Sequence, residues 1–146
     1  MRKLKMILHP TDFSEAAVEA MDVAHSLARD HGATLVVLGV AVPQMSIAEL
    51  RDAEMMATVE LMHQQLSHLI STIPDVAVTC DAVQGLPGQA ILTVADEIHA
   101  DLIVMGTHGR RGVSRLLIGS VAEYVMRNAK CPVVTVRPNS ESHLPL

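Results

Sequence analysis

The sequence predicts an α/β fold, a single domain built on an open, doubly wound sheet of five parallel strands with helices on both faces. Short and nearly continuous apolar runs alternate along the chain with longer segments whose apolar residues recur at helical spacing. Strands that alternate with helices in this way form parallel βαβ units with right-handed crossovers. The core must be aliphatic, because 49% of the 146 residues are hydrophobic while the chain holds one Phe and one Tyr.

The first third of the chain predicts a strand, a helix and a second strand. Residues 4–9 are an apolar run that Pro10 halts, which indicates a first buried strand. Ser14 is a good N-cap for the helix that follows, and His31-Gly32 supplies the stop of that helix. Residues 33–42 are almost continuously apolar and β-branched, as is typical of a strand that is covered on both faces.

The middle of the chain predicts a long helix and an edge strand. Residues 46–49, Ser-Ile-Ala-Glu, form a capping box for a helix over 46–72. Its apolar residues step by four, three, four and three along one face: Met55, Val59, Met62, Leu66 and Leu69. Such a stripe favours a core-facing helix, with a partner surface as the alternative. In 76–83 the polar Thr79 and Asp81 indicate an edge strand with one wetter face.

The last third predicts two more helices and two more strands. Pro87 can occupy the first turn of a helix that continues to about residue 98. An apolar strand over 101–105 follows it. After a glycine-rich loop, the pattern predicts a helix over 120–128 and a final strand over 133–136.

Composition excludes several classes of function. A net charge of −5 argues against a general nucleic-acid role, which normally needs a basic face. Cys80 and Cys131 belong to no metal-binding pattern, and unpaired cysteines fit a reducing cytosol. No apolar run approaches the roughly 18 residues of a membrane span, and the N-terminal one is too short for a signal peptide. We therefore expect a cytoplasmic protein with one domain over 1–137 and a loose tail over 138–146.

The most informative motif follows the strand at 101–105. It reads Gly106, two residues, Gly109, nine residues, then Gly119-Ser120. Glycines let the backbone approach an anion closely, and the helix that opens at Gly119-Ser120 adds unpaired N–H groups and its positive dipole end. The motif predicts a phosphate cradle, with a surface loop of turn glycines and solvated arginines as the alternative. Neither the Walker pattern nor GxGxxG is present.

If the first and fourth strands are neighbours in the sheet, a second group of residues lies opposite this loop. In such a sheet, ligands bind beyond the carboxyl ends of the strands, where the strand order reverses. The segment Pro10-Thr11-Asp12 would then face the glycine loop. Asp12 suits a ribose hydroxyl, or it stabilises the start of the next helix. His108 would donate to a phosphate or be a solvated loop histidine, and Arg110 makes the loop locally positive. A carboxylate that can bind a ribose, beside a loop that can bind phosphate, indicates a nucleotide site.

These residues carry a resemblance to a known family. The chain resembles the universal stress proteins over nearly all of residues 2–137, in four segments: Ile7–Ser14, Ala100–Arg110, Gly119–Val121 and Ala129–Val136. In that family Gly-2x-Gly-9x-Gly-Ser/Thr marks the members that bind ATP, and this sequence keeps the pattern whole. The resemblance implies an adenine-nucleotide-alpha-hydrolase-like fold with the strand order 3-2-1-4-5, and a homodimer paired through the last strand, Val133–Val136.

The resemblance also implies which residues would hold ATP together with Mg²⁺. Contacts to adenine and ribose would come from Pro10, Asp12, Val40 and Met105, with Thr11 beside them. The phosphates would lie on Gly106, Gly109, Gly119, Ser120 and Val121, near His108 and Arg110. The sequence departs from the family's usual pattern at His9, where an apolar residue is common, and at Gly39, where a larger residue is common.

Three functions follow, in order of preference. The first is an ATP-binding regulatory protein of the stress response, a dimeric switch that responds to nucleotide. The second is a slow Mg²⁺-dependent ATPase; no SGGxDS, HxGH or Walker element and no evident catalytic base is present, so no catalytic residue is assigned. The third is a nucleotide-free module that binds a partner through the helix at 46–72 or the last strand.

Overall fold

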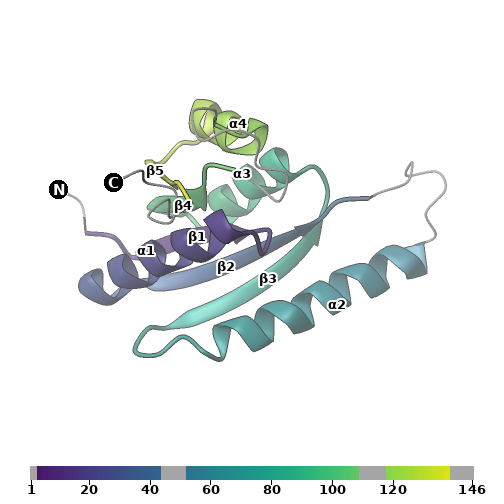
Figure 1. Cartoon of the computed structure of the whole chain (residues 1–146), viewed down its shortest axis with the longest axis horizontal. Coiled ribbons are helices and arrows are strands. Elements are labelled where there is room, and N and C mark those ends of the chain that lie inside the picture. Colours follow the sequence, from purple (N-terminus) through teal and green to yellow (C-terminus); the bar gives the residue numbers. More distant parts are fainter. Residues whose placement is uncertain (1–2, 44–51, 109–117, 139–146) are drawn as a thin grey trace, which may run out of the picture.

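The structure, a computed structural model, describes residues 3–43, 52–108 and 118–138. Strands and helices alternate along these residues in the following order: β1 (Met6–Thr11), α1 (Glu15–His31), β2 (Thr34–Ala41), α2 (Asp52–Ile70), β3 (Val78–Gln84), α3 (Pro87–Glu97), β4 (Leu102–Gly106), α4 (Ser120–Asn128) and β5 (Val133–Val136). The strands form one parallel sheet in the order β3-β2-β1-β4-β5 (Figure 1). The predicted fold class and strand order are confirmed.

Each face of the sheet carries its own hydrophobic core, because alternate residues of a strand point to opposite faces. On one face, Ile7 of β1 belongs to a cluster that includes residues of α1 and Leu66 of α2. On the other face, Leu8 belongs to a cluster with Ile91 of α3 and Val125 of α4. Helices therefore cover both faces, as predicted, and α1 and α2 lie on the face opposite α3 and α4 (Figure 1).

Local chemistry sets both ends of α1. The hydroxyl of Ser14 accepts a hydrogen bond from the amide of Ala17 at 3.2 Å, so Ser14 is the N-cap. Gly32 ends the helix in the left-handed region, with φ of 64°. Glycine adopts that conformation without steric strain. The predicted cap and stop of this helix are both confirmed.

One predicted boundary is wrong, because Pro10 does not halt the first strand. The strand β1 continues through Pro10, which pairs with Leu38 of β2, and ends at Thr11. Proline is tolerated in the pairing with β2 because its missing N–H points to the other side, toward β4. The other boundaries lie within two residues of the prediction, except the start of α2, since residues 46–51 of the predicted helix lie outside the described part. The capping box at 46–49 and the tail at 139–146 lie outside the described residues.

The stripe on α2 is a core-facing surface over part of its length. Leu66 is fully buried, and Met62 and Leu69 pack against the same core cluster. Met55 and Val59, nearer the start of the helix, are half-buried. The interpretation as core is therefore confirmed where α2 crosses β2 and β3.

The two edges of the sheet differ in polarity. Thr79 and Asp81 of β3 are exposed, so the predicted wetter face of this edge strand is confirmed. At the opposite edge, the four residues Val133–Val136 of β5 are all half-buried.

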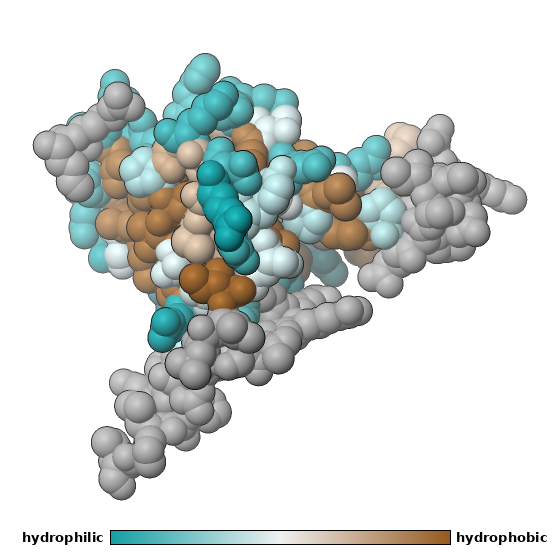
Figure 2. Space-filling model, turned by 90° about the horizontal axis from the view of Figure 1, so that it is seen from above, coloured by the Kyte–Doolittle hydropathy of each residue, from teal (hydrophilic) through white to brown (hydrophobic). Residues whose placement is uncertain are grey.

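Viewed from the side of α4, apolar side chains gather in patches between polar ones (Figure 2), and Tyr124 and Met126 of α4 are among the exposed large apolar residues. None of the helices in the described parts combines the length and apolarity that a membrane crossing requires.

The departure at Gly39 has a packing reason. A Cβ atom on Gly39 would lie 2.7 Å from Sδ of Met62 and 3.0 Å from Cδ1 of Leu66. Because real Cβ atoms do not approach neighbours so closely, α2 rests directly on the backbone of β2 at this glycine. The long side chain of Met62 fills the space that a larger residue would take.

We expect Gly39→Ala to lower the free energy of unfolding by about 1–2 kcal/mol, because the added methyl forces Met62 out of its rotamer. Urea denaturation of the two proteins measures this loss. The double variant Gly39→Ala/Met62→Ala is the control, since it removes the clash. Its loss should be clearly smaller than the sum of the two single losses. Strictly additive losses would show that Gly39 and Met62 do not compete for this space.

Candidate functional site

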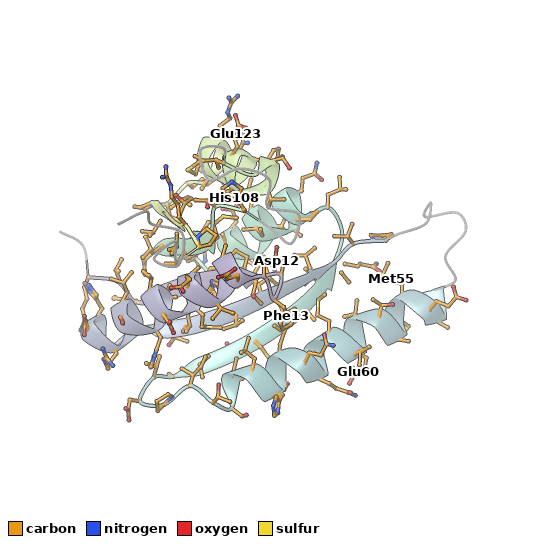
Figure 3. The ribbon with its side chains drawn as sticks, viewed as in Figure 1. Asp12, Phe13, Met55, Glu60, His108 and Glu123 are labelled. Carbon is orange, nitrogen blue, oxygen red and sulfur yellow. The ribbon has the colours of Figure 1, made fainter. Side chains whose placement is uncertain are left out.

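Two segments that are far apart in sequence meet where the strand order reverses. The loop after β1 holds Asp12 and Phe13, and the segment after β4 holds Thr107 and His108. Because β1 and β4 are parallel neighbours, their carboxyl ends lie at the same edge of the sheet. Figure 3 shows Asp12 and Phe13 on the loop before α1 and His108 beyond β4. The fold therefore brings together the two segments that the sequence placed opposite each other.

The loop after β1 is held by its own side chains. The hydroxyl of Thr11 accepts a hydrogen bond from the amide of Phe13 at 3.1 Å, and Oδ1 of Asp12 accepts one from the amide of Ser14 at 2.9 Å. Phe13 has a φ of 63°, which is unusual for a bulky residue. The exposed Asp12 thus shapes the start of α1, and this structural role is compatible with a second one toward a ligand.

Glycines at the other side of the site are required by close packing. A Cβ atom on Gly106 would lie 2.8 Å from Cβ of Ala16 and 3.0 Å from its carbonyl carbon, because α1 begins against the end of β4. A Cβ atom on Gly119 would lie 2.9 Å from the carbonyl oxygen of Thr107. The amide of Gly119 donates to that same oxygen at 2.6 Å. The sequence suggested that these glycines let the backbone approach an anion. The structure shows that each glycine also avoids a steric clash with a neighbouring segment.

The bond between Gly119 and Thr107 brings the start of α4 to the end of β4. Gly119 is the N-cap of α4 and provides no side chain to cap it. The amides in the first turn of a helix have no acceptor within the helix, so the amides of Ser120 and Val121 are available to a ligand. Ser120 is exposed and Val121 is half-buried. Gly109 and Arg110, the centre of the predicted cradle, lie outside the described residues.

His108 is not the solvated loop histidine that was the alternative interpretation. Its side chain is half-buried, and its Nδ1 lies 2.9 Å from the hydroxyl oxygen of Thr107. The second ring nitrogen, Nε2, is buried and has no hydrogen-bond partner among the described residues. A buried polar atom without a partner is uncommon and favours contact with a ligand.

The residues expected at the adenine end share one face of the sheet. Val40 of β2 and Met105 of β4 both belong to the core on the side of α3 and α4. Pro10 is two residues beyond Leu8 and so points to the same face. Met105 is 5% exposed, so it offers only a small surface to a base. Gly106 faces α1 on the other side of the sheet.

His9 is a feature of the site to which sequence reasoning assigned no role. It is fully buried in β1, and its Nδ1 lies 2.8 Å from the carbonyl oxygen of Val104. Because a carbonyl only accepts, Nδ1 carries the proton and donates it. Burial lowers the pKa of His9 to about 4, although the bond to Val104 and the charge of Asp12 both raise it. The signal in the sequence was a polar residue inside an apolar strand, directly before a proline.

Comparison with known proteins agrees with this architecture. The profile of the Universal stress protein family matches residues 3–137. The chain belongs to the universal stress protein family. Universal stress protein MJ0531 of Methanocaldococcus jannaschii is 31% identical over 139 residues, which cover 91% of this chain and 82% of that protein.

Solved structures of universal stress proteins and their relatives share the fold. The structure of the hypothetical protein MJ0577 has 27% identity and a TM-score of 0.80, over 94% of this chain and 99% of that one. A universal stress protein solved in complex with cAMP has 25% identity and a TM-score of 0.68, over 94% of this chain and 100% of that one. In the part of this chain that the structure describes, no three histidine, cysteine or acidic side chains converge as metal ligands.

Proposed function

We propose that this chain is a cytoplasmic, ATP-binding regulatory protein of the stress response, and that nucleotide occupancy changes the pairing of its homodimer. The observation that carries the proposal is the hydrogen bond from Gly119 to Thr107. It places the N-terminus of α4 beside the end of β4, at the edge of the sheet where the loop of Asp12 also lies. A helix N-terminus that lacks a side-chain cap attracts an anion, and a nearby carboxylate suits a ribose.

The proposed site has three parts within the domain at 1–137. The base lies on the face formed by Pro10, Val40 and Met105, and the ribose lies near Thr11 and Asp12. The phosphates lie on the N-terminal turn of α4 and the glycine loop, and this group comprises Gly106, His108, Gly109, Arg110, Gly119, Ser120 and Val121. Mg²⁺ bound with ATP would neutralise part of the triphosphate charge.

Two further observations support a nucleotide ligand. The buried Nε2 of His108, for which the described residues provide no partner, fits a group that exchanges a hydrogen bond with a phosphate oxygen. A relative of 25% identity was solved in complex with cAMP, which shares adenine, ribose and a phosphate with ATP. The half-buried edge strand β5 supports pairing of two copies through Val133–Val136, because an unpaired edge presents free backbone groups.

We expect the purified, nucleotide-stripped protein to bind about one ATP per chain in calorimetric titration with Mg²⁺ present, and GTP to bind much more weakly. A ligand that binds only the native state raises its stability by about 2.7 kcal/mol at 100 times its Kd. The melting temperature should therefore rise with ATP. Size-exclusion chromatography with and without ATP tests the switch. Absence of binding up to millimolar ATP would mean that the glycine loop is purely structural.

Hydrolysis is the second measurement on the same samples. The sequence offers no evident catalytic base and no Walker element, so we expect phosphate release far slower than about 1 per second. A rate at or above that value, lost in Asp12→Ala, would make the protein an enzyme rather than a switch.

A further inference from the structure

The pairing of β1 with β4 lacks one backbone hydrogen bond at the candidate site. In a parallel ladder, alternate residues of a strand bond to the same neighbour. The carbonyl of Lys5 accepts from Thr34, on the side of β2, whereas the carbonyl of Met6 accepts from Asp101, on the side of β4. The even-numbered residues of β1 therefore face β4, and the next even positions are residues 8 and 10.

The register identifies the carbonyl that is left without a backbone donor. Leu8 pairs with Ile103, so position 9 lies opposite Val104. The amide of Ile103 donates to Pro132 on the side of β5, so Val104 faces β1, and the amide of residue 10 would reach its carbonyl. Residue 10 is a proline and has no amide hydrogen. Val104 is buried, and a buried carbonyl without a donor is costly.

His9 supplies the missing donor from its side chain. Its Nδ1 lies 2.8 Å from the oxygen of Val104, and the imidazole is fully buried. The other ring nitrogen, Nε2, is buried without a partner among the described residues. An aliphatic side chain would fill this place without that orphaned nitrogen. The gain from His9 in this environment is therefore the bond to Val104.

We propose that His9 is a positioning residue for the nucleotide site, because its Nδ1–H replaces the amide that Pro10 lacks and holds the end of β4 against β1. Val104 lies two residues before Gly106, and His9 lies three residues before Asp12. The bond thus joins the strand that carries the ribose side of the site to the strand that carries the phosphate side. This inference rests on the proposed binding of ATP.

The test compares His9→Asn with His9→Leu by calorimetric titration with ATP and Mg²⁺, on samples shown by circular dichroism to be folded. The amide nitrogen of asparagine is as many bonds from Cβ as Nδ1 is, so it can donate to Val104, whereas leucine of similar size cannot. We expect the leucine variant to bind ATP at least about tenfold more weakly and the asparagine variant to stay within about threefold of the wild type. His9→Val replaces His9→Leu if the latter does not fold.

A second experiment uses Pro10→Ala, which gives residue 10 a backbone amide hydrogen. In a Pro10→Ala background, the additional His9→Leu change should weaken ATP binding by less than about threefold, because the alanine amide bonds to Val104. A full tenfold effect in that background would overturn the inference, as would a leucine variant that binds like the wild type or an asparagine variant that binds as weakly as leucine.

The outcomes separate this inference from the proposed function. A wild-type protein that binds no ATP would refute the proposed function and the positioning role with it. Wild-type binding that is insensitive to His9→Leu would refute the positioning role alone. Nuclear magnetic resonance of ¹⁵N-labelled histidine is independent of ATP: a proton on Nδ1 at pH 7 is the expected result, and a proton on Nε2 would overturn the assigned bond.

Discussion

Replacing Ser120 with aspartate should lower the affinity for ATP by about 100-fold, equivalent to about 3 kcal/mol. Ser120 is the first residue of α4 and is exposed at the proposed phosphate end. A carboxylate there repels a triphosphate. The same carboxylate interacts favourably with the helix dipole and adds about 0.3–1 kcal/mol to stability, so the variant should remain folded. Calorimetric titration with ATP measures the loss.

The matched control for this charge is Ser120→Asn, which has nearly the same shape and no charge. We expect it to bind ATP within about tenfold of the wild type, because at most one hydrogen bond to a phosphate oxygen is lost. Adenosine, which has no phosphate, should bind the two variants equally. Equal ATP affinities of the aspartate and asparagine variants would mean that the phosphates do not lie at α4.

Acidification should destabilise the protein through His9 by about 3 kcal/mol between pH 7 and pH 4. The pKa of His9 is lowered from 6.5 to about 4 in the folded protein, chiefly by burial. Between these two values the unfolded chain takes up a proton that the native protein does not. The contribution of the neutral His9 to the free energy of unfolding is therefore fully present above pH 6.5 and is lost as the pH drops toward 4. Urea denaturation across this range measures the slope.

Other groups also titrate in this range, so the contribution of His9 is a difference between two proteins. His9→Asn removes the titrating ring and keeps a donor for Val104. The free energy of unfolding of this variant should fall less steeply between pH 6.5 and pH 4. Over this range the wild type should lose up to about 3 kcal/mol more than the variant. Parallel curves would show that His9 takes up its proton equally in the folded and unfolded states.

Local patterns were sufficient to predict most of the elements of this fold. The N-cap at Ser14 and the stop at Gly32 depend on hydrogen bonds and backbone conformations within a few residues, so the sequence around them contains the whole cause. The same holds for Pro87 in the first turn of α3. The end of β1 was predicted wrongly at Pro10. The effect of a proline in a strand depends on which group of the neighbouring strand its missing N–H would have faced.

The sequence predicted that the two segments of the candidate site lie close together, and the contacts between elements at this place were found only in the tertiary structure. The order of strands and the glycine spacing sufficed to place Asp12 opposite Gly106, since parallel neighbours end at one edge of a sheet. The amide of Gly119 bonds to Thr107 across a loop, and Gly106 lies against Ala16 from a different element. Spacing along a chain does not encode such contacts.

Taken by itself, the sequence determined the succession of strands and helices and the family, and it suggested the residues of the proposed anion site, because each rests on nearby residues or on the spacing within one loop. Tertiary structure alone decided the roles of His9 and Gly39. Each is defined by a partner in another element, Val104 for the imidazole and Met62 for the glycine. Which atoms a buried group meets depends on how the strands and helices pack, and packing is a property of the whole fold.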